Sequence, residues 1–479
     1  MRRLITKLLI LMLPATIGAQ SDTLTLTLGE AIAMAQQRSY DARAAHHTLL
    51  AAEWSYKFHK ANHLPTLTLT SSPNLNRVIN KITLPDGSSS FVEQNQLSTN
   101  IALGITQNVA LTGGQLFLKS TLQRQDEFEH KSIAYNSQPV VVGYQQSLFG
   151  YNSLKWEQRI EPLRYESALK SYKESMELIA SRCANHFFAL ASAQTELYIA
   201  EYNYAAADTL SYFARGRYKI GTITESEMLQ LELNKITAKT NAMNAQSHLE
   251  DAMLTLRSYL AIDETTNIKV ETDSRIPDHS ADIGKAIELA HEHSPELVTY
   301  KRLQQESKSA LAQAKANAGL KAELYLQFGL SQTAEKLHKS YHSPQNQEYA
   351  SISLTLPLLD WGRGKGRVKI AESNAALVET EIEQARTEFD INIGKMVRQY
   401  NLQAHKVKAA QKSVVLAQKR YNVARHLYIS GKSTILDLNA ATSEKDAAYR
   451  GEIAALQTFW SLYYGLRSIT GGEIFNNKK

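Results

Sequence analysis

The sequence has very little cysteine, and two long parts of it have no proline. Cys183 is the only cysteine, so an exported chain has no internal disulfide, and small disulfide-stapled folds are excluded. No proline occurs between Pro162 and Pro277 or after Pro357, and the first of these tracts contains only two glycines, Gly216 and Gly221. Because both residues interrupt helices, each tract is predicted to form very long helices.

Concentrated positive charge is also missing, although the formal net charge is +6. The basic residues are scattered, without a basic cluster interleaved with aromatics, so nucleic-acid binding is not expected. A hydrophobic fraction of 43% with 21% charged residues excludes a disordered chain. No stretch has eighteen consecutive apolar residues, so any crossing of a membrane is expected to use strands.

The N-terminus has the features of a secretory signal, which we place at residues 1–19. It starts with Arg2 and Arg3, continues with an apolar run from Leu8 to Leu13, and ends with small residues, so cleavage is expected after Ala19. No cysteine stands directly after this position, and the chain is therefore not expected to be a lipoprotein.

The chain contains an internal repeat. Offsetting the sequence by 210 residues aligns Gly221 with Gly431, and an offset of 255 aligns residues 60–62 with 315–317. The two offsets differ by 45 residues, so the first half carries an insertion between Asn62 and Leu148. We expect it to add a hairpin, turning at Leu111 to Gln115, to a barrel or its inner rim.

Strand-like alternation is found in the middle of each half. Residues 66–70 read TLTLT, and residues 351–356 of the second half read SISLTL. A half-buried soluble sheet alternates in the same way, but aromatic residues at the strand ends favour a membrane barrel. These aromatic residues are Tyr144, Phe149, Tyr151, Tyr349 and Trp361.

The proline-free tracts carry helical periodicity. An apolar stripe with a period of about 3.6 residues runs from Val378 to Tyr428, and a second row includes Leu416 and Val423. A helix with two apolar rows can pack on both sides, as in a ring of helices. One chain has too few strands to close a barrel, and an open sheet edge is costly in lipid, so several copies are expected to close one barrel.

The sequence GKST at residues 431–434 is not a phosphate-binding loop, because His426 occupies the position where the first glycine is required. A helix–turn–helix corner with Gly431 in a left-handed cap is predicted instead. His59 and His63 have no third ligand in the sequence, so no metal site is expected. No catalytic constellation, cofactor motif or enzymatic activity is expected.

Glu227 and Asp437 each lie six residues after a corner glycine. One interpretation is an acid favoured by the helix dipole at a helix start. The other is a carboxylate ring that lines an opening when several copies assemble, and that selects for cations.

The order of these features resembles the TolC-like outer-membrane efflux proteins, the outer membrane factors. The resemblance covers the mature chain and depends on LFGYNSLKW at 148–156, LPLLDWGRG at 356–364 and YISGKSTILDL at 428–438. It implies a mainly α fold with membrane β, built from a duplicated helix–strand–strand–helix repeat. In such a homotrimer an outer-membrane β-barrel is continued by a long α-helical barrel in the periplasm.

The resemblance also implies partners and site residues. An inner-membrane transporter delivers small molecules through a periplasmic adaptor, and the duct exports them passively. Tyr428 matches a gate tyrosine and Asp437 a gate aspartate, with Glu227 as the equivalent acid, whereas Ala440 and Ser433 replace a second aspartate and an arginine. The expected adaptor-docking residues are Arg217, Tyr218, Gly221, Thr222, Gly431, Lys432 and Ser433.

Two other functions stay open. The duct of a type I protein secretion system has the same sequence features, and a trimeric barrel-anchored adhesin is a different class that normally has its strands at one chain end. The expected organisation is a first repeat at 20–262, a connector at 263–282, a second repeat at 283–471 and a tail at 472–479. Within the repeats we expect strands at about 64–149, 322–331 and 349–358, and long helices at 151–216, 224–260, 363–429 and 434–469.

Overall fold

A computed structural model describes residues 23–129, 131–263 and 265–475. The predicted signal peptide at residues 1–19 lies outside these ranges. The chain divides into two compact units. The corner unit comprises the described parts of residues 1–45, 175–289 and 393–479, and the sheet unit comprises those of 46–174 and 290–392.

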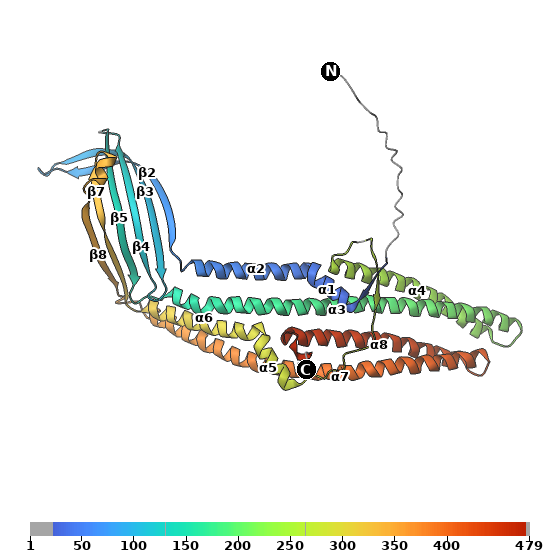
Figure 1. The fold of residues 1–479 in the computed structure, drawn as a ribbon. Coiled ribbons are helices and arrows are strands. Elements are labelled where there is room, and N and C mark those ends of the chain that lie inside the picture. Colours follow the sequence, from blue (N-terminus) through green and yellow to red (C-terminus); the bar gives the residue numbers. More distant parts are fainter. Residues whose placement is uncertain (1–22, 130, 264, 476–479) are drawn as a thin grey trace, which may run out of the picture. The chain divides into compact units, whose positions relative to one another are not determined.

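Four long helices form the corners (Figure 1). Helix α3 (Ser153–Lys219) and helix α7 (Arg363–Ile429) have 67 residues each, about 100 Å at 1.5 Å per residue. Helices α4 (Glu225–Leu260) and α8 (Ile435–Ile469) return from the corners. The expected long helices are thereby confirmed. None of the described helices has the length and apolar character that crossing a membrane requires.

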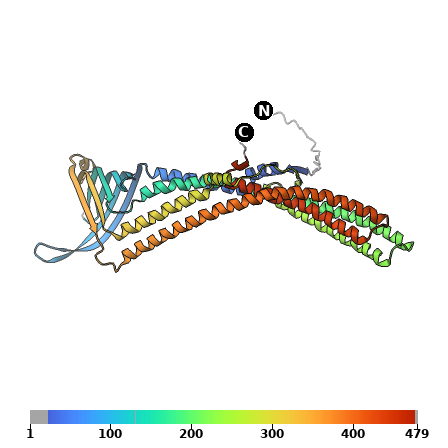
Figure 2. The ribbon, with the colours of Figure 1, turned by 90° about the horizontal axis from the view of Figure 1, so that it is seen from below.

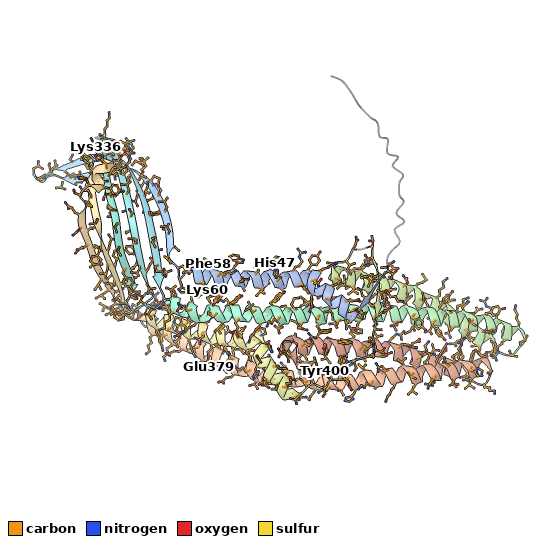
Figure 3. All side chains as sticks on the ribbon, viewed as in Figure 1. His47, Phe58, Lys60, Lys336, Glu379 and Tyr400 are labelled. Atoms are coloured by element: carbon orange, nitrogen blue, oxygen red, sulfur yellow. The ribbon has the colours of Figure 1, made fainter. Side chains whose placement is uncertain are left out.

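The corner unit has an aromatic core around the apolar stripe of α7. Tyr400, labelled in Figure 3, is fully buried, and its ring centroid lies 5.2 Å from that of Phe459 and 5.1 Å from that of Phe475. Phe475 ends the short 3-10 helix η2 (Glu473–Phe475). The predicted stripe is therefore the packing face of α7 in this unit.

The shorter elements of the chain precede or follow the long helices in the sequence. Strand β1 (Thr23–Thr27) pairs in parallel with β6 (Asn267–Glu271), so the stretch 263–282 contains a strand as well as a connection. Thr27 caps the helix α1, where Glu30 completes a capping box. The other short helices are α1 (Leu28–Arg38), α2 (Tyr40–Ala61), α5 (Ile283–His293) and α6 (Pro295–Ala318).

The sheet unit contains six antiparallel strands in the order β2-β3-β4-β5-β7-β8. The 3-10 helix η1 (Leu337–Tyr341) lies between β7 and β8 in the sequence and packs on β5 and β7. The β2–β3 hairpin extends beyond its neighbours, as Figure 2 shows. The strands are β2 (Thr66–Thr83), β3 (Ser89–Val109), β4 (Gly114–Glu127), β5 (Ser132–Ser147), β7 (Lys321–Ala334) and β8 (Gln345–Thr355).

The insertion in the first half adds strands to this sheet. An offset of 255 aligns the start of β2 with the start of β7, and an offset of 210 aligns β5 with β8. The pair β3–β4 has no counterpart, so it is the hairpin that the insertion was expected to add. Its turn occupies residues 110–113, closed by a 2.8 Å hydrogen bond from Gly113 N to Val109 O. Gly114 and Gln115, placed in the turn by the sequence, already belong to β4.

Candidate functional site: two helix corners and a two-faced sheet

Both corners have the same backbone geometry. Gly221 and Gly431 adopt left-handed conformations, with φ of 75° and 73°. Thr222 N donates to Arg217 O, and Lys432 N donates to Leu427 O, each over 2.9 Å. This pattern is the Schellman motif, which ends a helix on a glycine. The predicted left-handed cap at Gly431 is confirmed, and GKST forms a corner rather than a phosphate loop.

The acids of the two corners cap the returning helices. Thr224 and Thr434 are the N-caps of α4 and α8, and Glu227 and Asp437 complete their capping boxes. Asp437 Oδ2 accepts hydrogen bonds from the hydroxyls of Ser433 and Thr434, both at 3.0 Å. These bonds lower the pKa of the exposed Asp437 carboxyl. Asp437 therefore has a structural role and also carries a negative charge in solvent.

Tyr428, which matches a gate tyrosine of the similar family, lies where the two corners meet. Burial raises the pKa of the Tyr428 phenol, the positive charge of Arg217 opposes that shift, and the negative charge of Glu227 adds to it. Tyr428 and Arg217 line a cavity of about 240 Å³ together with Ile223. The structure thus brings Tyr428, Arg217 and Glu227 from different corners into one neighbourhood.

The expected docking residues are mostly at the surface. Arg217 is half-buried beside Tyr428, whereas Tyr218 is exposed. Ser433, which stands where the resemblance places an arginine, is half-buried and is engaged by Asp437. The exposed positions of the two turns are Gly221, Thr222, Gly431 and Lys432. Adaptor docking at these positions stays a prediction.

One face of the six-stranded sheet is apolar along its whole width. The strand registers place the residues of this face in rows that cross neighbouring strands. The side chains remain exposed, with values between 39% for Ile105 and 71% for Leu69. Members of this face are Leu67, Leu69, Ile101, Leu103, Ile105, Leu116, Leu118, Val142, Phe328, Ile352 and Leu354. An exposed apolar face of this size is suited to contact with lipid.

The opposite face of the sheet is hydrophilic and carries little charge. Amide and hydroxyl side chains bond across strands, for example Gln123 Nε2 to Ser98 Oγ at 2.8 Å and Gln125 Nε2 to Gln96 Oε1 at 2.6 Å. Tyr349 contacts Tyr325 on this polar face and not on the apolar face. The sequence suggested Tyr349 as an aromatic residue at a strand end, but Tyr349 lies inside β8, and the alternation of side chains turns it away from the apolar face.

A buried polar cluster between α3 and α8 was missed by the sequence analysis. Lys445 and Asp446 are 3% and 7% exposed, and Lys445 Nζ lies 3.2 Å from Asp446 Oδ1. Asn203 Nδ2 donates to Asp446 Oδ2 over 2.6 Å. Lys445 Nζ also lies 4.5 Å from the ring centroids of both Tyr202 and Tyr421.

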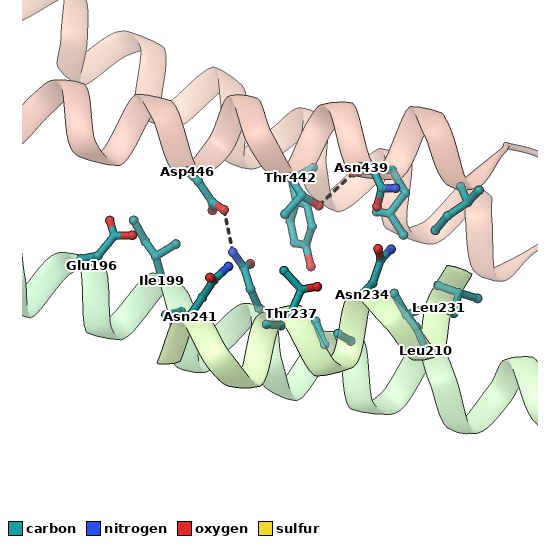
Figure 4. Close-up of a pocket in the computed structure, with 18 of the residues that line it drawn as sticks. Glu196, Ile199, Leu210, Leu231, Asn234, Thr237, Asn241, Asn439, Thr442 and Asp446 are labelled. Carbon is teal, nitrogen blue, oxygen red and sulfur yellow. Dashed lines mark hydrogen bonds between the residues drawn. The ribbon is translucent and has the colours of Figure 1, made fainter. Parts of the chain in front are cut away.

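This cluster borders a polar cavity of about 260 Å³ between the two helical hairpins (Figure 4). Amide groups of Asn234, Asn241 and Asn439 line it, and Arg450 pairs with Glu196 at its rim. The only feature of the sequence that could have indicated this burial is the position of Lys445, one helical turn after the apolar Ala441. Lysine and aspartate are usually exposed, so the pattern gave no reason to place them inside.

No metal centre is formed by the described residues, in which no group of three potential histidine, cysteine or carboxylate ligands converges. His59 and His63 contact each other edge to face, with ring centroids 4.8 Å apart. Burial lowers the pKa of His59, and the neighbouring His63 adds to this effect. The pair is an aromatic contact at the end of α2.

The comparison with protein families decides the class of this chain. Residues 31–261 and 286–472 match the model of the outer membrane efflux protein family. The chain belongs to this family. The matched segments coincide with the two structural repeats, and the family consists of outer-membrane channels rather than enzymes. A comparison with curated proteins found no match.

Solved channels of low sequence identity share the fold. The outer membrane protein VceC of Vibrio cholerae has 14% identity and a TM-score of 0.66, covering 93% of this chain and 96% of that one. The CmeC outer membrane channel of Campylobacter jejuni has 14% identity and a TM-score of 0.67, with coverages of 93% and 85%. The open state of the Neisseria gonorrhoeae MtrE channel has 14% identity and a TM-score of 0.60, with coverages of 94% and 90%.

Proposed function

We propose that three copies of this chain form the outer-membrane exit duct of a tripartite efflux system. An inner-membrane transporter delivers small molecules through a periplasmic adaptor, and the duct lets them pass without chemistry of its own. The two-faced sheet carries this proposal, because an exposed apolar face with a hydrophilic face behind it is what a water-filled channel in lipid requires.

The helices supply the part of the duct outside the membrane. Each 67-residue helix, about 100 Å long, separates the strands from a corner along the chain. The second apolar row of α7 is exposed in a single copy, with Leu416 at 66% and Val423 at 59%. Packing this row against the helices of neighbouring copies would close a tube with its wall one helix thick.

The corners are the proposed gate and docking region. In a trimer Asp437 and Glu227 occur three times each, and rings of carboxylates favour cations. Tyr428 packs between these corners, where a change in the packing of the two hairpins would move it. The exposed turns at Thr222 and Lys432 offer the surface to a periplasmic adaptor.

The test is electrical. The purified, detergent-solubilised oligomer is added to one side of a planar lipid bilayer, and the current is recorded at fixed voltage. The proposal predicts discrete conductance steps that persist without any energy source. A purified oligomer that inserts into the bilayer without conducting would contradict the function as a duct.

A second recording addresses the direction from which cargo enters. An antibody against the corners, or the adaptor, should change the current when it is added on the side of the bilayer where the corners lie. The same addition on the other side should not change it. Equal effects from both sides would contradict the assignment of the corners as the docking end.

A further inference from the structure

The two outer strands of the sheet have free edges that fit each other. Within the part of the chain that the structure describes, β2 and β8 each pair on one side only. The six strands alternate in direction, so β2 and β8 run antiparallel to each other. The apolar face continues to both edges, where Leu69 is 71% and Leu354 is 66% exposed. A free edge in hydrocarbon leaves backbone donors and acceptors without partners, and therefore requires a covering strand.

A second copy of this chain matches that requirement in side-chain pattern. Residues 66–70 of β2 alternate threonine and leucine, and residues 351–355 of β8 alternate serine or threonine with isoleucine or leucine. If Thr66 lies opposite Thr355 of the next copy, Leu67 faces Leu354 and Thr68 faces Ser353. A slip by one residue would place leucine opposite serine and put apolar side chains on the polar face.

The register inside one copy is consistent with closure. A row across the sheet from Thr66 ends at Tyr349, six residues from Thr355 along β8. If Thr66 pairs with Thr355 of the next copy, a row of paired residues that crosses one copy is displaced along the strands by these six residues. One residue of shift per strand corresponds to a strand tilt of about 35°, within the range of natural barrels. The row consists of Thr66, Thr106, Phe117, Gly143, Gln327 and Tyr349.

We propose that the inserted β3–β4 hairpin widens the exit pore: β2 of each copy pairs with β8 of the next, and three copies close a barrel of eighteen strands. The number of copies rests on the proposed function, whereas the six strands of each copy come from the sheet. Eighteen strands at this tilt give a backbone diameter of about 34 Å, and barrels of this size enclose an aqueous channel. Two hairpins per copy without β3–β4 would give twelve strands and a diameter of about 22 Å.

The inter-copy register is tested by disulfide crosslinking. Cys183 is fully buried, so a double variant T68C/S353C has two new accessible thiols. Mild oxidation of membranes should link copies into closed covalent trimers that reducing agent separates. The variant T68C/I352C is the matched control, because its two thiols lie on opposite faces of the sheet. The register is contradicted if T68C/S353C gives no inter-copy product, or if the control links equally well.

The widening is tested by deleting Ser89–Lys131, which removes β3 and β4 and keeps the turn at 84–88. Graded polyethylene glycols are added on the sheet side of single channels. The full-length channel should admit polymers of roughly 1.5-fold greater diameter than the deletion variant. If the largest polymer that enters is the same for the full-length channel and the deletion variant, the inference is wrong. If the deletion variant does not assemble, the crosslinks decide alone.

These outcomes separate two failures. A full-length oligomer that does not conduct contradicts the proposed function. If the full-length oligomer conducts but T68C/S353C gives no crosslink, the proposed function stands and the eighteen-strand barrel is contradicted.

Discussion

At the scale of single residues, Asp437 combines helix capping with an exposed charge. Its carboxylate accepts hydrogen bonds from Ser433 and Thr434, and Ala440, where the resemblance places a second acid, is exposed and uncharged. Glu30 makes the same type of capping box with Thr27 at α1, away from the corners. The chain therefore contains a natural control that separates capping from selectivity.

We expect Asp437→Ala to weaken the cation preference of single channels and their block by multivalent cations. The reason is the loss of three charges from the proposed ring. Reversal potentials in asymmetric KCl, with and without added Mg²⁺, measure both effects. Glu30→Ala loses an equivalent cap and should keep the wild-type selectivity. Unchanged selectivity in Asp437→Ala would remove this residue from the gate.

The pKa of Asp437 also predicts a pH dependence. Hydrogen bonds from Ser433 and then Thr434 lower this pKa below the ordinary 3.8, so the carboxylate stays charged at mildly acidic pH. The cation preference due to Asp437 should then persist from pH about 7 to about 4 and decline only below that. The difference in reversal potential between wild type and Asp437→Ala, recorded across this range, measures it. A loss of the difference near pH 6 would contradict the assignment.

Gly431 is constrained by its backbone conformation rather than by space. Its φ is 73°, and an added Cβ would meet only Arg217 Nη2, at 3.8 Å. We expect Gly431→Val to lower the stability of the corner by more than about 1 kcal/mol, because a β-branched residue is strained there. Crosslinking of the corner to the periplasmic adaptor should fall as well.

Gly451 of α8 is the matched control, since it is exposed, helical and has no atom within 4 Å of an added Cβ. Gly451→Ala should stabilise the protein by about 0.5–1 kcal/mol in urea unfolding. Wild-type adaptor crosslinking in Gly431→Val would argue against the corner as the docking site.

At the scale of helices, periodicity predicts which side packs but not what polar groups it buries. Tyr400 and Tyr421 of the predicted stripe are 0% and 2% exposed. The stripe could be predicted because burial of an apolar row is the main tertiary driving force on a helix. Lys445 and Asp446 could not, because their burial depends on Asn203 and Tyr202 of a helix more than 200 residues away in the sequence.

We expect Lys445→Met alone to destabilise the packing of α8 on α3 by about 3–5 kcal/mol, since it leaves Asp446 buried without its cation. Replacing both residues, as in Lys445→Met with Asp446→Leu, should restore much of this loss because no uncompensated charge remains. Urea-unfolding midpoints followed by helical circular dichroism measure both.

Arg450→Ala is the control for this pair. Arg450 and Glu196 form an ion pair whose side chains are 51% and 37% exposed, so its loss should cost less than about 1 kcal/mol. Equal losses for Lys445→Met and Arg450→Ala would show that burial of the cluster does not determine its contribution.

At the scale of the whole molecule, the duplication and the long helices followed from sequence offsets and from missing prolines. The number of strands did not, because period-two alternation identifies a strand without naming its partners. The insertion could be located by the two offsets, yet its place between β2 and β5 depends on pairing across the sheet. Tyr349 shows the same limit, since its face is fixed by the register with Gln327.

The two faces of the sheet require different side chains, apolar on one face and polar on the other, and adjacent residues of a strand belong to different faces. Leu69 belongs to the apolar face, and Thr68, next to it in β2, belongs to the polar face; both are exposed in one copy. In water these positions would tolerate arginine equally. In a lipid-embedded barrel, arginine at a lipid-facing position costs about 2–4 kcal/mol at the bilayer midplane and less near the interface.

We therefore expect Leu69→Arg to reduce the amount of assembled oligomer in outer-membrane fractions, and Thr68→Arg to assemble normally while shifting selectivity toward anions. Gel mobility of unheated membrane extracts measures assembly, and reversal potentials measure selectivity. The comparison between adjacent residues removes effects of strand propensity, since both substitutions introduce the same side chain into the same strand. If Thr68→Arg blocks assembly and Leu69→Arg does not, the face assigned to lipid is the one that faces the water-filled lumen.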